Sequence, residues 1–305
     1  MSQLLLNWGV LTALVAFALC VGSFLNVVVY RLPRMQDRDF RREAAAVLAE
    51  APTHAPVPDN FNLSVPRSRC TTCGRMVRGH ENIPVLSWLW LRGRCAGCGS
   101  AISVRYPIVE AFTAVLSVIV AVHFAGTLVL PHYAGVTVVP AQDITAVVQC
   151  ALALIFTWWL IALAAIDLDT GYLPDALTLP LLWLGLVANV FATFVPLDQA
   201  VWGAVLGYLA LWSVYWMFKL VTGKEGFGYG DFKLLAALGA WLGWHKLLAV
   251  IIISSAVGAV VGIALIMLKR SRRDSQIPFG PFLAAAGWIV MLLPGDDFVS
   301  RYTLL

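Results

Sequence analysis

The stretch QLLLNWGVLTALVAFALCVGSFLNVVVY, residues 3–30, contains no charged side chain, and no basic segment precedes it. At about 28 positions it is longer than the roughly 7–15 apolar residues of a cleaved signal peptide. It is long enough to cross a hydrocarbon core of about 30 Å as a helix. The sequence therefore predicts a retained membrane-spanning helix here.

The whole chain has the composition of a membrane protein. Of its 305 residues, 60% are hydrophobic and 12% are charged, whereas soluble domains have about 25% charged residues. So few charges cannot cover the surface of a soluble protein of this length, because folded soluble proteins need a polar shell. Further apolar stretches follow the first one, at 108–130, 144–166, 176–195, 200–221, 232–242, 247–268 and 279–293. We expect an all-α polytopic membrane protein with about eight transmembrane helices.

The basic residues indicate how the chain is oriented. Arg31 and Arg34 follow the first stretch, so the positive-inside rule places the N-terminus outside and the next loop in the cytoplasm. With this orientation, all but two of the 21 basic residues lie in or beside cytoplasmic segments. The net charge of +4 therefore reflects topology in contact with membrane lipid, and we expect no nucleic-acid partner.

Four of the six cysteines form two C-x-x-C pairs, CTTC and CAGC, in the first cytoplasmic loop. The 21 residues between the pairs are close to the roughly 15–20 typical of zinc sites. A glycine after each pair allows a tight turn that presents two thiolates to a tetrahedral Zn²⁺. Two disulfides are the alternative, which a reducing cytoplasm disfavours. The pattern predicts a small zinc-ribbon-like domain with a structural site at Cys70, Cys73, Cys95 and Cys98.

Acidic residues beside the predicted spans form two groups at the same membrane face. The sequence IDLDTGYLPD contains Asp167, Asp169 and Asp175, and GFGYGDFK contains Asp231. A charge at the centre of a span costs about 2.5–3.5 kcal/mol, so acids at span ends that face a shared cavity are functional candidates. Two adjacent carboxylates would share a proton, and the ionised one could activate water against a peptide carbonyl. This arrangement would suit aspartic-protease chemistry.

The same acids also permit simpler interpretations. Asp231 could cap the helix that follows it, and the other three could be solvated charges at the membrane interface. The residues themselves do not choose among Asp167, Asp169 and Asp175 as the partner of Asp231.

Several motifs together resemble the bacterial type IV prepilin peptidases, also called leader peptidases. They run in the family's order over nearly the whole chain: GSFLNVVVYRLP (22–33), the two C-x-x-C pairs, ENIPVLSW (81–88), RGRC (92–95), RYPIVE (105–110), IDLD (166–169) and GYGDFKLL (228–235). Many members of the family have C-P-x-C where this chain has CTTC and CAGC, but all four cysteines remain.

The resemblance implies a bifunctional enzyme of the bacterial inner membrane. Such enzymes cleave the basic leader of type IV prepilins and type II secretion pseudopilins at the cytoplasmic face, then N-methylate the new N-terminus from S-adenosylmethionine. By motif, the family's catalytic aspartates correspond to Asp167 and Asp231, and its glycine associated with methyl transfer corresponds to Gly93.

We therefore expect three parts, namely a first transmembrane helix (1–30), a cytoplasmic zinc-binding, methyltransferase-associated domain (31–107) and a transmembrane aspartic peptidase domain (108–305). Two other functions remain open. Asp167 and Asp169 could hold Mg²⁺ against a phosphate in a metal-dependent membrane transferase. Alternatively, the chain could be a non-catalytic scaffold for pilus or secretion assembly, and neutralising Asp167 or Asp231 would then leave function intact.

Overall fold

The computed structural model describes residues 2–48, 60–129, 141–223, 228–268 and 278–293. Within these ranges, helices are the only regular elements apart from two isolated β-bridges, which confirms the predicted all-α class. The chain divides into two compact units, Met1–Val136 and Thr137–Leu305, and we describe each unit by itself.

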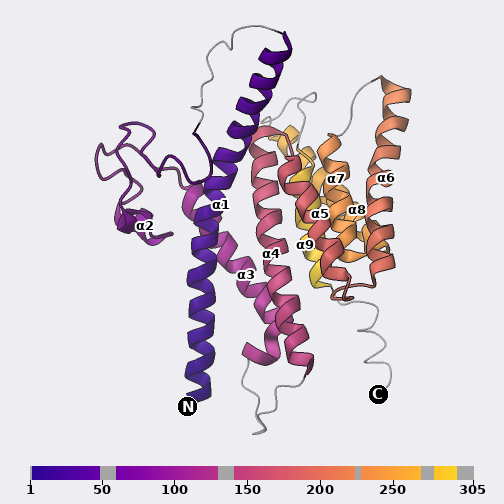
Figure 1. Cartoon of the computed structure of the whole chain (residues 1–305), viewed down its shortest axis with the longest axis horizontal. Helices are drawn as coiled ribbons and strands as arrows, with labels where there is room; N and C mark the ends of the chain where they lie inside the picture. Colours follow the sequence, from indigo (N-terminus) through magenta and orange to yellow (C-terminus); the bar gives the residue numbers. More distant parts are fainter. Residues whose placement is uncertain (1, 49–59, 130–140, 224–227, 269–277, 294–305) are drawn as a thin grey trace. The chain divides into compact units, whose positions relative to one another are not determined.

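Figure 1 labels the α-helices. In the first unit the helices are α1 (Ser2–Leu48), η1 (Gly79–Asn82), α2 (Leu86–Trp90) and α3 (Arg105–Val129). In the second unit they are α4 (Ala141–Thr170), α5 (Asp175–Asn189), α6 (Leu197–Thr222), α7 (Tyr229–Leu242), η2 (Trp244–Lys246), α8 (Leu247–Met267) and α9 (Gly280–Leu292).

The central parts of all eight predicted apolar stretches are helical, but the helices differ in length. Among the described residues, five are long and apolar enough to cross a membrane, namely α1, α3, α4, α6 and α8. α5, α7 and α9 have 15, 14 and 13 residues, so each is about 20 Å long and falls short of a core of about 30 Å. The structure thus supports a polytopic membrane protein, and the count of eight spans stays a prediction.

The first helix is longer than the sequence predicts. Instead of ending near Tyr30, α1 continues to Leu48 with Pro33 inside it. The extension is rich in Arg and Ala, which are strong helix formers. The buried Arg31 guanidinium also donates to the carbonyls of Asn62 (2.8 Å) and Pro66 (2.6 Å). The extended helix therefore supports the cysteine-containing segment as well as forming the predicted span.

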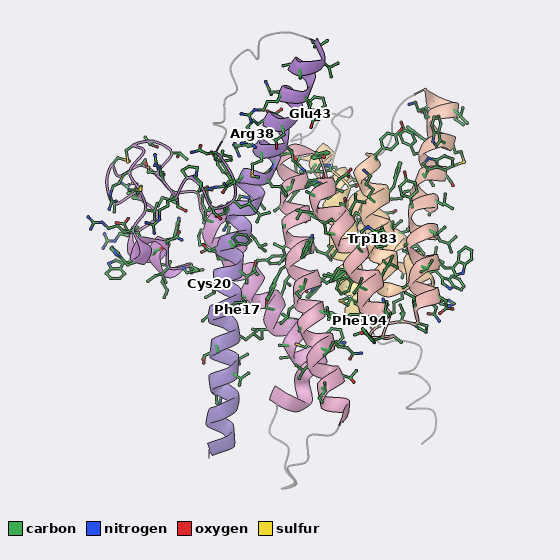
Figure 2. The ribbon with its side chains drawn as sticks, in the orientation of Figure 1. Phe17, Cys20, Arg38, Glu43, Trp183 and Phe194 are labelled. Atoms are coloured by element: carbon green, nitrogen blue, oxygen red, sulfur yellow. The ribbon has the colours of Figure 1, made fainter. Side chains whose placement is uncertain are left out.

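α1 and α3 pack closely in the first unit. A Cβ atom at Gly22 would lie 2.7 Å from Glu110 Cα, so only glycine permits this approach. Outside such contacts, both units expose apolar side chains, among them Phe17 on α1 (59% exposed) and Trp183 on α5 (63% exposed) (Figure 2). Exposed apolar surface on this scale is expected where a protein faces lipid.

α7 is the central helix of the second unit. Its residues from 231 to 242 are all buried except Lys233, because α5, α6 and α9 pack around it. α6 approaches most closely where Gly203 meets Gly239, and a side chain at either glycine would collide with backbone atoms. A helix surrounded by protein does not have to cross the bilayer unaided. α7 can therefore carry a polar side chain into the interior of the unit.

Candidate functional site

Asp167 lies in the last turn of α4 and is 4% exposed. The backbone N–H of Gly280, the first residue of α9, donates to its Oδ2 atom at 2.9 Å. A Cβ atom at Gly280 would lie only 2.6 Å from the same oxygen. Glycine is therefore needed at this position for the backbone to reach the carboxylate.

Asp231 lies in the first turn of α7 and is 7% exposed. Its Oδ2 atom accepts a hydrogen bond from the backbone N–H of Gly228 at 3.2 Å. One carboxylate oxygen thus satisfies a free donor at the start of the helix. The N-cap residue is Gly228, so Asp231 is not the N-cap itself, but its carboxylate caps the helix from within the first turn. A surface cap has no need of such burial.

Leu173 packs between the backbones that flank the two acids. It is 3% exposed, and Cβ atoms built at Gly230 and Gly280 would lie 2.7 Å from its Cβ and 3.1 Å from its Cδ1, respectively. Gly230 precedes Asp231, and Gly280 binds Asp167. The structure therefore brings Asp167 and Asp231 into one buried region.

The other two acids of the first group have different surroundings. Asp169 is exposed, whereas Asp175 forms an ion pair with Lys233, with its two carboxylate oxygens 2.6 and 2.7 Å from Nζ. Lys233 lies one turn into α7, and Asp175 is the first residue of α5. This ion pair joins the start of α5 to the start of α7, and neither Asp169 nor Asp175 shares the burial of Asp167.

Two buried carboxylates that repel each other cannot both be ionised without a large cost. A pair that holds one proton can donate a hydrogen bond from one carboxyl and accept a proton at the other. Such a pair can supply a general acid and a general base at the same place.

Sequence reasoning missed the residues that hold this pair, namely Gly280, Leu173 and Lys233. Leu173 and Lys233 belong to the motifs IDLDTGYLPD and GFGYGDFK, but neither motif indicated a role for them, and Gly280 lies outside both. Gly280 is 113 residues from Asp167 in the chain, and no local spacing links a backbone donor to such a distant acceptor.

The four predicted metal ligands come together in the first unit. The Sγ atoms of Cys70, Cys73, Cys95 and Cys98 all lie within 4.8 Å of one another, and all four cysteines are free of disulfide bonds. The Sγ atoms of Cys70 and Cys98 are 3.8 Å apart. Tetrahedral Zn–S bonds of about 2.3 Å place sulfurs about 3.8 Å apart, so this donor set fits Zn²⁺.

Each C-x-x-C pair forms the same backbone turn. In the first turn the Gly74 N–H donates to Cys70 O at 2.9 Å, and the Cys70 N–H donates to Arg75 O at 2.9 Å. The second turn repeats both hydrogen bonds over residues 95–100. Gly74 and Gly99 both have φ of +69°, a conformation that glycine adopts readily. The glycine after each pair therefore has the role that the sequence predicted for it.

Hydrogen bonds favour the ionised form of two of these thiols. The backbone at Cys73 and the Ser100 hydroxyl lower the pKa of Cys70 to about 5. Ser100 also lowers the pKa of the Cys98 thiol, whose Sγ lies 3.1 Å from the hydroxyl oxygen. The thiolate is the form that binds a metal, so these two thiols favour metal binding. At Cys73 the Arg75 backbone hydrogen bond is outweighed by the side chains of Cys98 and Cys70, which raise the pKa of that thiol to about 11.

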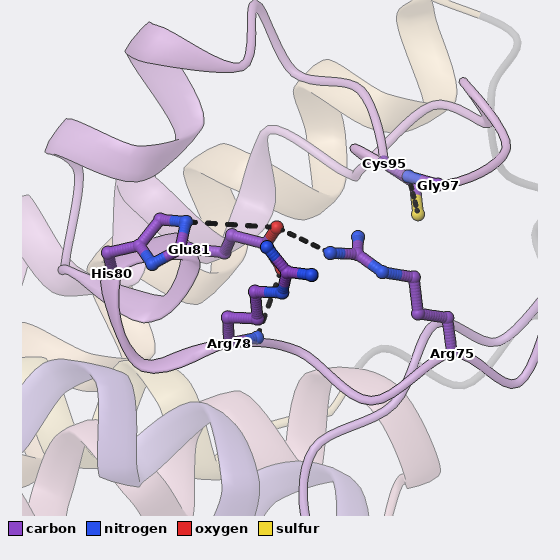
Figure 3. A network of polar contacts seen from close by, with 6 residues as sticks. All are labelled: Arg75, Arg78, His80, Glu81, Cys95 and Gly97. Carbon is purple, nitrogen blue, oxygen red and sulfur yellow. Dashed lines mark hydrogen bonds and ion pairs between the residues drawn. The ribbon is translucent and has the colours of Figure 1, made fainter.

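A polar network ties the first cysteine turn to η1 (Figure 3). Glu81 Oε1 lies 2.7 Å from Arg75 Nη2, and Glu81 Oε2 accepts from the Arg78 backbone N–H at 3.0 Å. The Arg78 N–H and the Arg75 guanidinium together lower the pKa of Glu81. The network fixes the path of the chain as it leaves the first turn.

Gly93 has a clear packing role in this segment. Its φ is +66°, and a Cβ atom would lie 2.8 Å from Cζ2 of the Trp88 indole. Its carbonyl accepts from the Ile102 N–H at 2.7 Å, and Trp88 Nε1 donates to Ile102 O at 3.1 Å. A glycine is therefore required here for local structure.

Two family models match the chain. The model described as the bacterial peptidase A24 N-terminal domain matches residues 16–124. The model described as the type IV leader peptidase family matches residues 154–263. No solved structure matches the chain.

Curated relatives match over nearly the full length. One from Aeromonas salmonicida (strain A449) is 50% identical over 297 residues, which cover 97% of this chain and 95% of the relative. One from Stutzerimonas stutzeri is 50% identical over 96% of this chain and 93% of the relative. One from Dichelobacter nodosus is 51% identical over 90% of this chain and 89% of the relative. All three are named prepilin leader peptidase/N-methyltransferase.

Proposed function

Because the chain belongs to the type IV leader peptidase family, we propose that it removes the leader peptide of prepilins and then N-methylates the new N-terminus. The relatives carry both activities in their names, and the match extends over nearly all of each chain. The family resemblance implies that type II secretion pseudopilins are processed in the same way, so we include them among the substrates. The protein is thus a membrane aspartic peptidase and methyltransferase.

We assign the peptidase reaction to Asp167 and Asp231. The ionised carboxylate takes a proton from water as the water oxygen attacks the scissile carbonyl carbon, and the protonated carboxyl donates a hydrogen bond to the carbonyl oxygen. The C–N bond of the tetrahedral intermediate then breaks, and the departing amine takes a proton from the carboxyl that had accepted one from water. The pair ends with one proton, as it began.

The observation that carries this assignment is the burial of both carboxylates around Leu173. Asp167 is held by the backbone N–H of Gly280 from α9, and Asp231 by the backbone N–H of Gly228 at the start of its own helix. The Mg²⁺ transferase alternative is disfavoured by the same structure. α4 continues through Thr170, so Asp167 and Asp169, two residues apart, do not share a helix face.

We propose that Zn²⁺ occupies the cluster of Cys70, Cys73, Cys95 and Cys98, where it would supply a structural cross-link. Its donors are four protein thiols, which complete a tetrahedron by themselves. S-adenosylmethionine is the methyl donor that the resemblance implies. We assign Gly93 to the methyltransferase part of the protein, through the packing that it permits around Trp88.

We propose an inner-membrane location with the N-terminus outside and the active site facing the cytoplasm, since that orientation keeps nearly all basic residues inside. The functional division into a first helix (1–30), a zinc-binding domain (31–107) and a peptidase domain (108–305) also stays a proposal. By packing alone, α3 belongs with α1 in the first unit.

The proposed function is tested by incubating the purified full chain with a purified prepilin, with and without S-adenosylmethionine, and reading the product N-terminus by mass spectrometry. We expect a leaderless product in both reactions and one added methyl group only when the donor is present. An uncleaved prepilin, with the enzyme shown to be folded, would refute the peptidase activity. A cleaved but unmethylated product would refute the methyltransferase activity.

A further inference from the structure

α2 exposes an apolar face in the first unit. Leu86, Leu89 and Trp90 are 62%, 58% and 77% exposed. Their spacing of three and four residues places them on one face of the helix. An exposed cluster of large apolar side chains usually marks a contact surface.

The opposite face of α2 already supplies the local core. Trp88 packs against Gly93 and donates to Ile102 O. The apolar residues on the exposed face are therefore additional to those that hold the segment together.

A hydrogen bond fixes where α2 begins relative to the membrane-spanning helices of the same unit. The Val85 N–H, immediately before α2, donates to Glu110 Oε2 at 2.7 Å. Glu110 lies within the apolar span of α3, and Gly22 of the α1 span packs against its Cα atom. At 1.5 Å per residue, Glu110 lies about 7–8 Å along α3 from Arg105, where that helix begins. α2 therefore starts level with the second turn of the apolar span of α3.

The segment around α2 is strongly basic. Between residues 60 and 104, Glu81 is the only acidic residue. The exposed basic side chains of this segment are Arg67, Arg69, Arg78, Arg92 and Arg94. Basic residues beside an exposed apolar helix face are the combination that binds a membrane containing anionic lipids.

We propose that α2 is an interfacial membrane anchor. Leu86, Leu89 and Trp90 enter the lipid beside α1 and α3, and the arginines of residues 60–104 bind the headgroups of anionic phospholipids. The anchor holds the cysteine cluster against the bilayer surface. This proposal does not depend on the assignment of the catalytic residues.

The anchor is tested by placing the photoreactive residue p-benzoylphenylalanine at Trp90 in the full-length chain, reconstituted in vesicles of phosphatidylethanolamine and phosphatidylglycerol. The matched control carries the same residue at Met76, which is 55% exposed and directly follows the first cysteine turn. Unchanged metal content and prepilin cleavage show that both variants are folded. After irradiation, mass spectrometry identifies what each position has captured.

We expect phospholipid adducts at position 90 and severalfold fewer at position 76. Vesicles made of phosphatidylcholine alone should give severalfold fewer adducts at position 90, because they offer no net negative charge. Protein adducts at position 90, either within the chain or to a second copy, would show that α2 docks on protein and would overturn the proposal. Equal lipid adducts at both positions would overturn it too, and equal yields in the two kinds of vesicle would overturn its electrostatic part.

Discussion

Gly280 supplies the backbone N–H that holds Asp167, and an added methyl group would lie 2.6 Å from the accepting oxygen. We expect Gly280→Ala to displace the carboxylate and to lower prepilin cleavage by about 10²-fold, since misplacement of a reacting group by about 1 Å has effects of that size. Cleavage rates at saturating substrate measure this. Gly9→Ala is the control, because a Cβ atom there meets nothing within 4 Å. Equal rates for both variants would contradict the role of Gly280.

Gly93 gives a second prediction at the scale of one residue. An L-residue in its left-handed conformation costs about 1–2 kcal/mol, and the Trp88 indole would have to move as well. We expect Gly93→Ala to lose metal faster than wild type in a chelator and to methylate less. Metal content and product mass, measured in parallel, test this. Loss of methylation with wild-type metal retention would instead place Gly93 in direct contact with the donor or the amine.

The metal ligands and the candidate catalytic acids could be predicted from sequence because each is marked by a pattern of neighbouring residues. Two thiols in a C-x-x-C turn must lie close together, so Cys70, Cys73, Cys95 and Cys98 could be named at once. Acids beside apolar spans stand out for a similar reason. The choice of Asp167 over Asp169 depended on family motifs alone. Asp167 is buried because α9 and Leu173 pack around it, and such tertiary packing cannot be deduced from the local sequence.

At the scale of elements, the ion pair between Asp175 and Lys233 joins α5 to α7 near Asp231. We expect Lys233→Met to lower kcat by about 10- to 100-fold with little change in KM, because α7 would lose a contact that places Asp231. Lys233→Arg should keep most activity. The double variant Asp175→Lys/Lys233→Asp restores an ion pair with the charges exchanged. It should therefore recover part of the kcat that Asp175→Lys or Lys233→Asp loses alone.

The control for this prediction is another ion pair far from the acids in sequence. Asp37 and Arg41 form an exposed pair on α1 with N and O atoms 2.9 Å apart, and exposed pairs contribute about 0–1 kcal/mol. Asp37→Asn should leave kcat unchanged. If Lys233→Met also leaves kcat unchanged, the ion pair has no positioning role.

Helix positions followed from the apolar stretches, whereas helix lengths did not. α1 exceeds its predicted length because its extension contains strong helix formers and because Arg31 and Arg38 donate to carbonyls of residues 61–66. α7 can be shorter than a membrane-spanning helix because other helices surround it. Both effects involve tertiary contacts, which an apolar pattern along one segment does not encode.

At the scale of the molecule, the cysteine cluster and the acid pair lie in different units. The acid pair needs no metal for its chemistry. We expect a strong chelator to remove Zn²⁺ and to make residues 60–104 accessible to an added protease. The rate of prepilin cleavage should fall only to the extent that this segment unfolds. Metal content, limited proteolysis and cleavage are measured on the same sample.

Mg²⁺ added to the chelated protein separates two mechanisms. It should not raise cleavage if Asp167 and Asp231 act as general acid and base. Full recovery with Mg²⁺ alone would indicate a metal held by carboxylates and would contradict the aspartic mechanism.

The most direct test compares prepilin cleavage by the wild-type chain and by Asp167→Asn, Asp231→Asn and Asp169→Asn, each purified in detergent with folding checked by metal content and monodispersity. The buried pair predicts that the first two variants lose about 10²–10⁴-fold in rate, as expected for loss of general acid–base catalysis. Asp169→Asn, altered at an exposed position on the same helix, should cleave near the wild-type rate. If Asp167→Asn and Asp231→Asn both cleave at the wild-type rate, the aspartic mechanism is wrong and these acids are a helix cap and an interfacial charge.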